Sequence, residues 1–185
     1  MYIQRVLAIS AIVAMFLFDD AAQANDACPH ALPAPLLEIL KTEYPDWKLV
    51  DLEDLGSEGA DFYRKDADVY PEKNPTGCPG AARVDLYGDG QHAYALVLKR
   101  ESNNRVKSKL LLSEIDKSKK WVSRTLMDDE CVCAVRTIPP GEHTDVIKGN
   151  TIKSRGEAIL YIKYEAYAIV FAWTGQKIER VYVQD

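Results

Sequence analysis

The chain has 185 residues, of which 47% are hydrophobic, and it carries 23 Lys and Arg against 28 Asp and Glu, so its formal net charge at pH 7 is −5. This length suits one domain with a single buried core. The mild acidity argues against a nucleic-acid partner, because binding to phosphates favours a basic surface.

The first 24 residues have the pattern of a secretory signal peptide. Arg5 precedes an apolar run over residues 6–18, and the segment 22–24 reads Ala-Gln-Ala, a small-x-small cleavage site. The apolar run is too short to span a bilayer, so we expect no membrane span in the mature chain. The predicted organisation is a signal peptide over residues 1–24 and a single domain over residues 25–185, in a periplasmic or secreted protein.

Apolar residues at helical spacing predict one N-terminal helix over residues 36–44, between two prolines. Residues 47–50 are a candidate first strand. Residues 54–76 mix charge, Gly and Pro with weak periodicity, and we expect a long loop there. Its aromatic residues, which are Phe62, Tyr63 and Tyr70, would attach that loop to the core.

Strand-forming residues dominate the rest of the chain. A turn rich in Asp and Gly joins two such runs and predicts a β-hairpin over residues 83–100. Six further strands are expected, at residues 108–115, 121–126, 132–138, 158–164, 167–173 and 177–183. The fold class is therefore α+β, with one N-terminal helix and a mostly antiparallel β-sheet of hairpins that curls or splits into two meanders.

Alternation along the two strands at 158–173 predicts which residues share the apolar face of their hairpin. One strand contributes Ala158, Leu160, Ile162 and Tyr164, and the next contributes Tyr167, Ile169, Phe171 and Trp173. A stripe of this kind is typical of a sheet core.

The turn after residue 84 resembles the calcium loop in the short repeats of FG-GAP and VCBS-type extracellular β-propeller proteins. In that loop Asp-x-Asp/Asn-x-Asp-Gly-x-x-Asp precedes an apolar strand, and the resemblance covers residues 85–97. It implies that Asp85 and Asp89 are calcium ligands and that Gly90 makes the sharp turn.

Two ligand positions of that loop are not matched, because Tyr87 and Ala93 occupy them. Calcium takes six or more oxygen ligands, and two carboxylates supply few of them. We therefore favour a turn in which Gly88 and Gly90 provide positive φ angles and Asp85 caps the backbone, without a cofactor. Calcium bound by Asp85 and Asp89 is the alternative.

Four cysteines follow the expected cleavage site, and an even number in an exported chain indicates disulfides. One residue separates Cys131 from Cys133, so a bond between them would close a small strained ring. We expect Cys28 and Cys78 each to bond one member of this pair. The alternatives are a redox-active bond between Cys131 and Cys133, free thiols, and a soft-metal site that His143 or Cys78 completes.

Catalytic motifs are not evident. His30, His92 and His143 lie outside any zinc-protease pattern, and no Gly-x-Ser-x-Gly sequence is present. An enzyme is therefore the less favoured interpretation.

These observations favour an exported non-enzymatic binding protein of the cell envelope or medium, with an inhibitor or immunity-type role against a cell-wall hydrolase as its specific form. Its partner would be an envelope protein, and an acidic surface would attract a basic, lysozyme-like one. The alternatives are an enzyme acting on envelope glycans or peptides and a calcium-stabilised structural module. The candidate binding loops contain Tyr87, His92, Asp128, Asp129 and Glu130.

Overall fold

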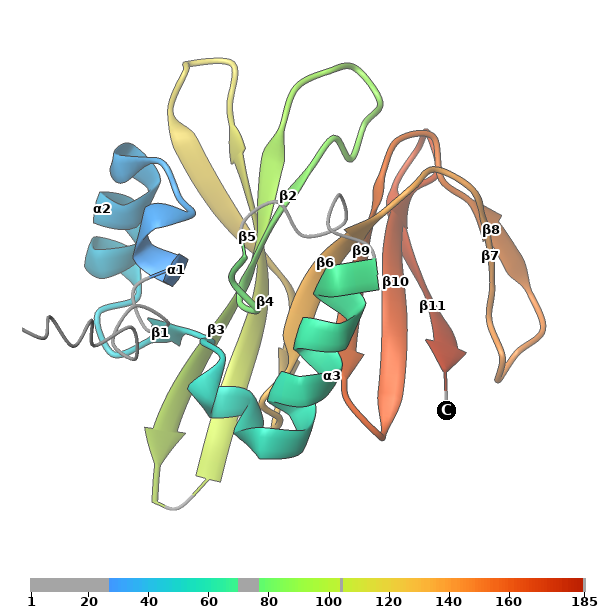
Figure 1. The fold of residues 1–185 in the computed structure, drawn as a ribbon. Helices are drawn as coiled ribbons and strands as arrows, with labels where there is room; N and C mark the ends of the chain where they lie inside the picture. The colour runs from blue at the N-terminus through green and yellow to red at the C-terminus, as the bar shows by residue number, and fades with distance from the viewer. Residues whose placement is uncertain (1–26, 70–76, 104, 185) are drawn as a thin grey trace, which may run out of the picture.

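Figure 1 shows the computed structural model of the chain, which describes residues 27–69, 77–103 and 105–184. The expected signal peptide and Tyr70 lie outside the described residues. Among the helices in the described ranges, none has the length and apolar character needed to cross a membrane.

Within the described residues, the strands form two antiparallel sheets and a separate hairpin. The first sheet has the order β1-β3-β4-β5, with β2 also paired to β3, and it contains β1 (Lys48–Leu49), β2 (Ala81–Val84), β3 (Ala93–Ser102), β4 (Arg105–Ile115) and β5 (Trp121–Asp129). The second has the order β11-β10-β9-β6, with β6 (Ala134–Ile138), β9 (Ala158–Lys163), β10 (Tyr167–Trp173) and β11 (Ile178–Gln184). The separate hairpin pairs β7 (Glu142–Thr144) with β8 (Thr151–Lys153). The expected α+β class with antiparallel meanders is confirmed.

The main hydrophobic core lies between the two sheets. Val97 and Leu112 of the first sheet belong to the same buried cluster as Ile159, Tyr161 and Phe171 of the second. Because successive side chains of a strand point to opposite faces, the first sheet also buries a second set of residues on its other face. That outer set includes Leu96, Leu98 and Leu111.

Two helices near the N-terminus cover this outer face (Figure 1). The helix α1 (Ala27–His30) precedes α2 (Ala34–Glu43), whose Leu36 and Leu40 are buried, so the predicted N-terminal helix is confirmed. A disulfide between Cys28 and Cys78 joins α1 to the segment before β2 and closes a sequence separation of 50 residues.

The expected long loop over residues 54–76 is wrong for the part that the structure describes. A short η1 (Glu53–Leu55) leads into the helix α3 (Gly56–Val69). Asp51 and Asp54 fix the start of η1 through reciprocal hydrogen bonds. The Asp51 carboxylate accepts the Asp54 backbone N–H at 3.1 Å, and the Asp54 carboxylate accepts the Asp51 backbone N–H at 2.9 Å. Between residues 56 and 65 the helix buries only Gly59, Ala60 and Tyr63, a stripe too narrow to give a clear helical period.

Arg136 of β6 anchors α3 to the second sheet. Its guanidinium lies 4.7 Å from the centre of the Tyr63 ring and donates a hydrogen bond of 2.7 Å to the Tyr63 carbonyl. Phe62 stacks on Tyr164, with ring centres 6.0 Å apart. The expectation that Phe62 and Tyr63 attach this segment to the core is therefore correct for Tyr63, which is buried, whereas Phe62 stays 39% exposed.

The predicted apolar face of the hairpin is correct for β10, whose Ile169 and Phe171 face the core between the sheets, and wrong by one position for β9. The register pairs Tyr161 with Ile169 and Ile159 with Phe171, so these four residues share the face between the sheets. Leu160 contributes instead to the outer face, where it is partly buried against the cluster that contains Ile152 of β8. Both faces of the hairpin are apolar and buried, so alternation alone does not identify the inner one.

Candidate functional site

The turn between β2 and β3 is organised by Asp85. Its carboxylate accepts the backbone N–H groups of Gly88, Asp89 and Gly90, at 2.9, 3.1 and 3.1 Å. Gly88 and Gly90 have φ angles of +69° and +80°, a region that residues with a Cβ rarely occupy. The prediction of a positive-φ turn capped by Asp85 is confirmed.

A hollow of about 380 Å³ lies beside this turn. Glu114 and Ile115, at the end of β4, form part of its wall, and Ile115 is 51% exposed. The complete lining consists of Tyr87, Asp89, Gln91, His92, Ala93, Glu114 and Ile115. The structure thus places two of the candidate binding residues, Tyr87 and His92, around one concavity.

Tyr87 is held in place from three sides. Its hydroxyl donates to a Glu114 carboxylate oxygen at 2.7 Å and accepts from the Arg124 guanidinium at 2.9 Å, and its ring meets Trp173 edge-on, with centres 5.3 Å apart. Burial, together with the hydrogen bond to Glu114, raises the pKa of Tyr87 to about 12. The phenol is therefore neutral and fixed in orientation at physiological pH.

The carboxylates proposed as calcium ligands both take part in the local hydrogen bonding of the turn. Besides the three bonds to Asp85, Asp89 accepts the Gln91 backbone N–H at 3.0 Å. A carboxylate has about four acceptor positions, so these bonds leave room for a cation. Calcium binding at Asp85 and Asp89 stays the untested alternative to a turn without a cofactor.

The acidic residues at the end of β5 border a different hollow, of about 460 Å³. Trp47 lies beneath two cations there, with the Arg100 guanidinium 4.9 Å and the Lys109 ammonium 5.2 Å from the ring centre. Lys109 also forms an ion pair with Asp128. Asp128, Asp129 and Glu130 all line this hollow, together with Ser108 and Lys107.

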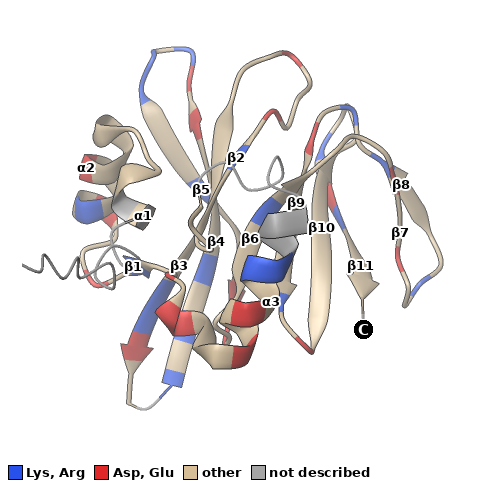
Figure 2. Cartoon of the chain, viewed as in Figure 1, with Lys and Arg blue, Asp and Glu red and all other residues tan. Residues whose placement is uncertain are grey.

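The charges around the second hollow are mixed. Figure 2 shows Lys and Arg on the ends of β3 and β4 nearest the turn that joins them, with an acidic position at the tip of β3, and Asp128 to Glu130 add further acidic groups to the lining of the hollow. Glu114 and Ser108 are six residues apart on β4. Glu114 contacts Tyr87 of the first hollow, whereas Ser108 pairs with Asp129 of the second. Six residues of strand span about 20 Å, so the structure does not bring the two sets of candidate binding residues together.

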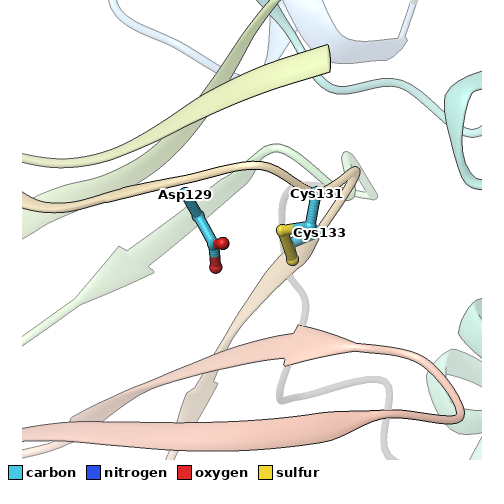
Figure 3. Close-up of side chains that lie close together, drawn as sticks. All are labelled: Asp129, Cys131 and Cys133. Carbon is cyan, nitrogen blue, oxygen red and sulfur yellow. A yellow bond between two sulfur atoms is a disulfide. The ribbon is translucent and has the colours of Figure 1, made fainter. Parts of the chain in front are cut away.

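The expected cross-pairing of the cysteines is wrong. Cys28 bonds Cys78, and Cys131 bonds Cys133 (Figure 3). The first pair belongs to the cluster under the N-terminal helices, and the second to the core between the sheets. The first sheet lies between these two clusters, so cross-pairing would require bonds through it.

Polar groups surround the bond between Cys131 and Cys133. The Cys131 sulfur lies 3.1 Å from the Tyr161 hydroxyl and 3.7 Å from the Ser108 hydroxyl. The carboxylate of Asp129 accepts a hydrogen bond from the Tyr167 hydroxyl and a longer one, 3.5 Å, from Tyr161. Burial is the largest cause that raises the pKa values of Tyr161 and Tyr167, so both hydroxyls keep their protons.

Sequence reasoning missed Ser108, Tyr161 and Tyr167 as neighbours of the cysteines. Each lies on a different strand, and only the register of β4, β9 and β10 brings them together. Alternation predicted a strand at each of these positions but not which face meets the disulfide.

The three histidines lie on separate elements. His30 ends α1, His92 lies in the turn before β3, and His143 is in β7. Burial lowers the pKa of His143, whose Nε2 lies 3.3 Å from the Ser154 hydroxyl. Within the described residues, the group of possible metal ligands at Cys131 and Cys133 includes Asp129 and neither His143 nor Cys78, and Cys78 is bonded to Cys28, so the soft-metal site with either of them as a ligand is wrong.

Comparison with known proteins finds no match: no family model, no curated protein and no solved structure matches the chain. Its function is therefore inferred from its own residues.

Proposed function

We propose that the chain is an exported, non-enzymatic binding protein that presents the turn at residues 85–92, with the hollow beside it, to a partner protein of the cell envelope or medium. Inhibition of a cell-wall hydrolase is the specific role that we propose for it. The observation that carries the proposal is the set of three backbone hydrogen bonds that the Asp85 carboxylate accepts within the turn.

A rigid loop binds with less loss of conformational entropy than a mobile one. The turn meets this requirement, because Asp85 fixes its backbone and the contacts of Tyr87 fix its largest side chain. Rigid presentation favours recognition of a preformed partner surface over binding of a flexible chain.

The lining of the hollow has the chemical mixture of a protein-binding surface. Tyrosine is enriched among the residues that dominate binding energy, and an exposed aliphatic residue at the rim gains free energy when a partner covers it. Tyr87 and Ile115 supply these two features, and Val122, in the neighbouring strand, is 42% exposed.

Charge and redox chemistry are compatible with an envelope location and a basic partner. The chain has a net charge of −5, which would accelerate association with a basic hydrolase at low ionic strength. The two disulfides in the described part of the chain are typical of an oxidising compartment.

The proposal is tested with the mature chain against a panel of muramidases and amidases, in binding and in inhibition assays. Replacing Ile115 by Ser is expected to weaken binding about tenfold, because it removes an apolar contact at the rim of the hollow. The matched control is Ile147→Ser, which changes an isoleucine of similar exposure, 59% against 51%, between β7 and β8.

Equal effects of the two isoleucine substitutions would place the binding surface elsewhere. No binding and no inhibition across the panel, together with no partner recovered from envelope extract, would overturn the proposal. Turnover of glycan or peptide substrate that is lost in His92→Ala would favour an enzyme instead.

A further inference from the structure

The two disulfides differ in what they do for the folded chain. The bond between Cys28 and Cys78 closes a separation of 50 residues, whereas the bond between Cys131 and Cys133 closes a separation of 2. A cross-link removes conformational freedom from the unfolded chain in proportion to the logarithm of the loop length. The bond between Cys131 and Cys133 is therefore a poor structural brace, and its position calls for another explanation.

Cys131 and Cys133 belong to the core between the sheets, but polar groups lie next to their sulfurs. The two sulfurs are buried, with 4% and 0% of each residue exposed, yet a carboxylate lies next to them. Figure 3 shows the Asp129 side chain and both sulfurs on the same side of the chain segment that carries them. Within the described residues, a carboxylate oxygen of Asp129 and the two sulfurs all lie within 4.8 Å of one another.

Small movements of these three ligand atoms would give the spacing that a four-coordinate zinc ion requires. Zinc takes thiolate sulfur at about 2.3 Å and carboxylate oxygen at about 2.1 Å in a tetrahedron, so its ligand atoms lie roughly 3.5–3.8 Å apart. Once the bond between Cys131 and Cys133 opens, the sulfurs need to separate to that distance, whereas the Asp129 oxygen, which lies within 4.8 Å of both, needs to move by at most about 1 Å.

The cluster is also connected to the surface. Ser108 and Asp129 both line the hollow of about 460 Å³ beside β5, and Ser108 lies 3.7 Å from the Cys131 sulfur. A cation or a small reductant that enters this hollow therefore reaches the residues in direct contact with the disulfide.

We propose that Asp129, Cys131 and Cys133 form a redox-controlled site for a thiophilic divalent cation of the zinc class, and that the disulfide is its oxidised, metal-free form. A dithiol reductant transfers two electrons and two protons to the disulfide, which yields two thiols while the dithiol becomes a disulfide. Zinc then displaces the two thiol protons to solvent and binds both thiolates and the Asp129 carboxylate. Water from the adjoining hollow completes the four ligands.

This site is independent of the turn that carries the proposed function. The two regions are about 20 Å apart along β4, and no residue lines both hollows. The failure of either proposal therefore leaves the other intact.

The experiment uses the full mature chain, reduced with dithiothreitol, freed of reductant without oxygen, and titrated with zinc against a chromophoric chelator. We expect one zinc per reduced chain and none per oxidised chain. Asp129→Asn keeps an oxygen that accepts the tyrosine hydrogen bonds but removes the charge, and it should weaken zinc binding about tenfold or more. Cys131→Ser with Cys133→Ser should abolish it.

Alkylation followed by peptide mapping identifies the binding cysteines even where a variant folds poorly. In the reduced wild-type chain, zinc should protect Cys131 and Cys133 from alkylation and leave the reactivity of Cys28 and Cys78 unchanged. The proposal is overturned if reduced and oxidised chains take up equal amounts of zinc, if the reduced chain takes up none, or if protection falls on Cys28 and Cys78.

Discussion

Asp85 and Glu157 hold each other through a reciprocal pair of hydrogen bonds across 72 residues of sequence. The Glu157 carboxylate accepts the Asp85 backbone N–H at 2.6 Å, and the Asp85 carbonyl accepts the Glu157 backbone N–H at 2.9 Å. Gly156 directly precedes Glu157 and packs closely against the turn. A Cβ added to it would lie 2.3 Å from the Asp85 carbonyl oxygen and 2.4 Å from the Gly88 nitrogen. The turn proposed to bind the partner is thus supported by the loop that leads into β9 of the other sheet.

Replacing Gly156 by Ala should lower the free energy of unfolding by about 3 kcal/mol, because the backbone of the turn has to move away from the added methyl group. Gly141→Ala is the matched control, since a Cβ there has no neighbour within 4 Å, and it should change stability by less than about 0.5 kcal/mol. Denaturant unfolding of both variants measures the difference. Equal stabilities would show that the two segments do not approach this closely.

The two disulfides should contribute unequally to stability. Replacing both Cys28 and Cys78 by Ala should cost about 4 kcal/mol through the lost constraint on the unfolded chain, whereas the same change at Cys131 and Cys133 should cost about 1.5 kcal/mol through that effect. Thermal melting of the two double variants gives the comparison, and mass mapping of non-reduced peptides checks the pairing. A larger loss from the second variant would contradict the interpretation that this bond is not a brace.

Stability should fall on mild acidification because of His143. Burial lowers the pKa of this ring in the folded chain, while the unfolded chain takes up the proton near the ordinary value of about 6.5. The contribution of neutral His143 to the free energy of unfolding is therefore fully present above that pH, and it is lost as the pH falls through the folded-state pKa. The free energy of unfolding of wild type should fall between pH 7.5 and pH 5, and His143→Asn should make this fall smaller. Denaturant unfolding of both proteins at the two pH values measures the difference. An unchanged difference would indicate that His143 titrates alike in both states.

Local pattern was sufficient for the strands of the two main sheets and for the first helix, but it missed the short strands β7 and β8. It was also insufficient wherever two segments distant in sequence decide the outcome. The helix α3 was missed because its contacts with Arg136 replace a wide apolar stripe. The cysteine pairing depends on which face of the first sheet each cysteine occupies, and the neighbourhood of Asp129 depends on the register of three strands. The capped turn was predicted correctly because Asp85, Gly88 and Gly90 determine it locally.

The last prediction compares two neighbouring residues of that turn. Gly90→Ala should lower the free energy of unfolding by about 1–2 kcal/mol, because an L side chain is strained at a φ of +80°, although no atom lies within 4 Å of the added Cβ. Asp89→Ala gives up the hydrogen bond from the Gln91 backbone N–H and should cost at most about 1 kcal/mol. Thermal melting of both variants with chelator present establishes this order for the cation-free turn.

The same series run in millimolar calcium separates the turn from a working calcium site. If backbone geometry alone holds the turn, wild type should melt at the same temperature with calcium and with chelator, and Gly90→Ala should stay the more destabilised variant in both. If Asp85 and Asp89 bind calcium, the ion should raise the melting temperature of wild type, because it binds only the folded chain. Asp89→Ala would then abolish that rise, and its loss relative to wild type would exceed that of Gly90→Ala only when calcium is present.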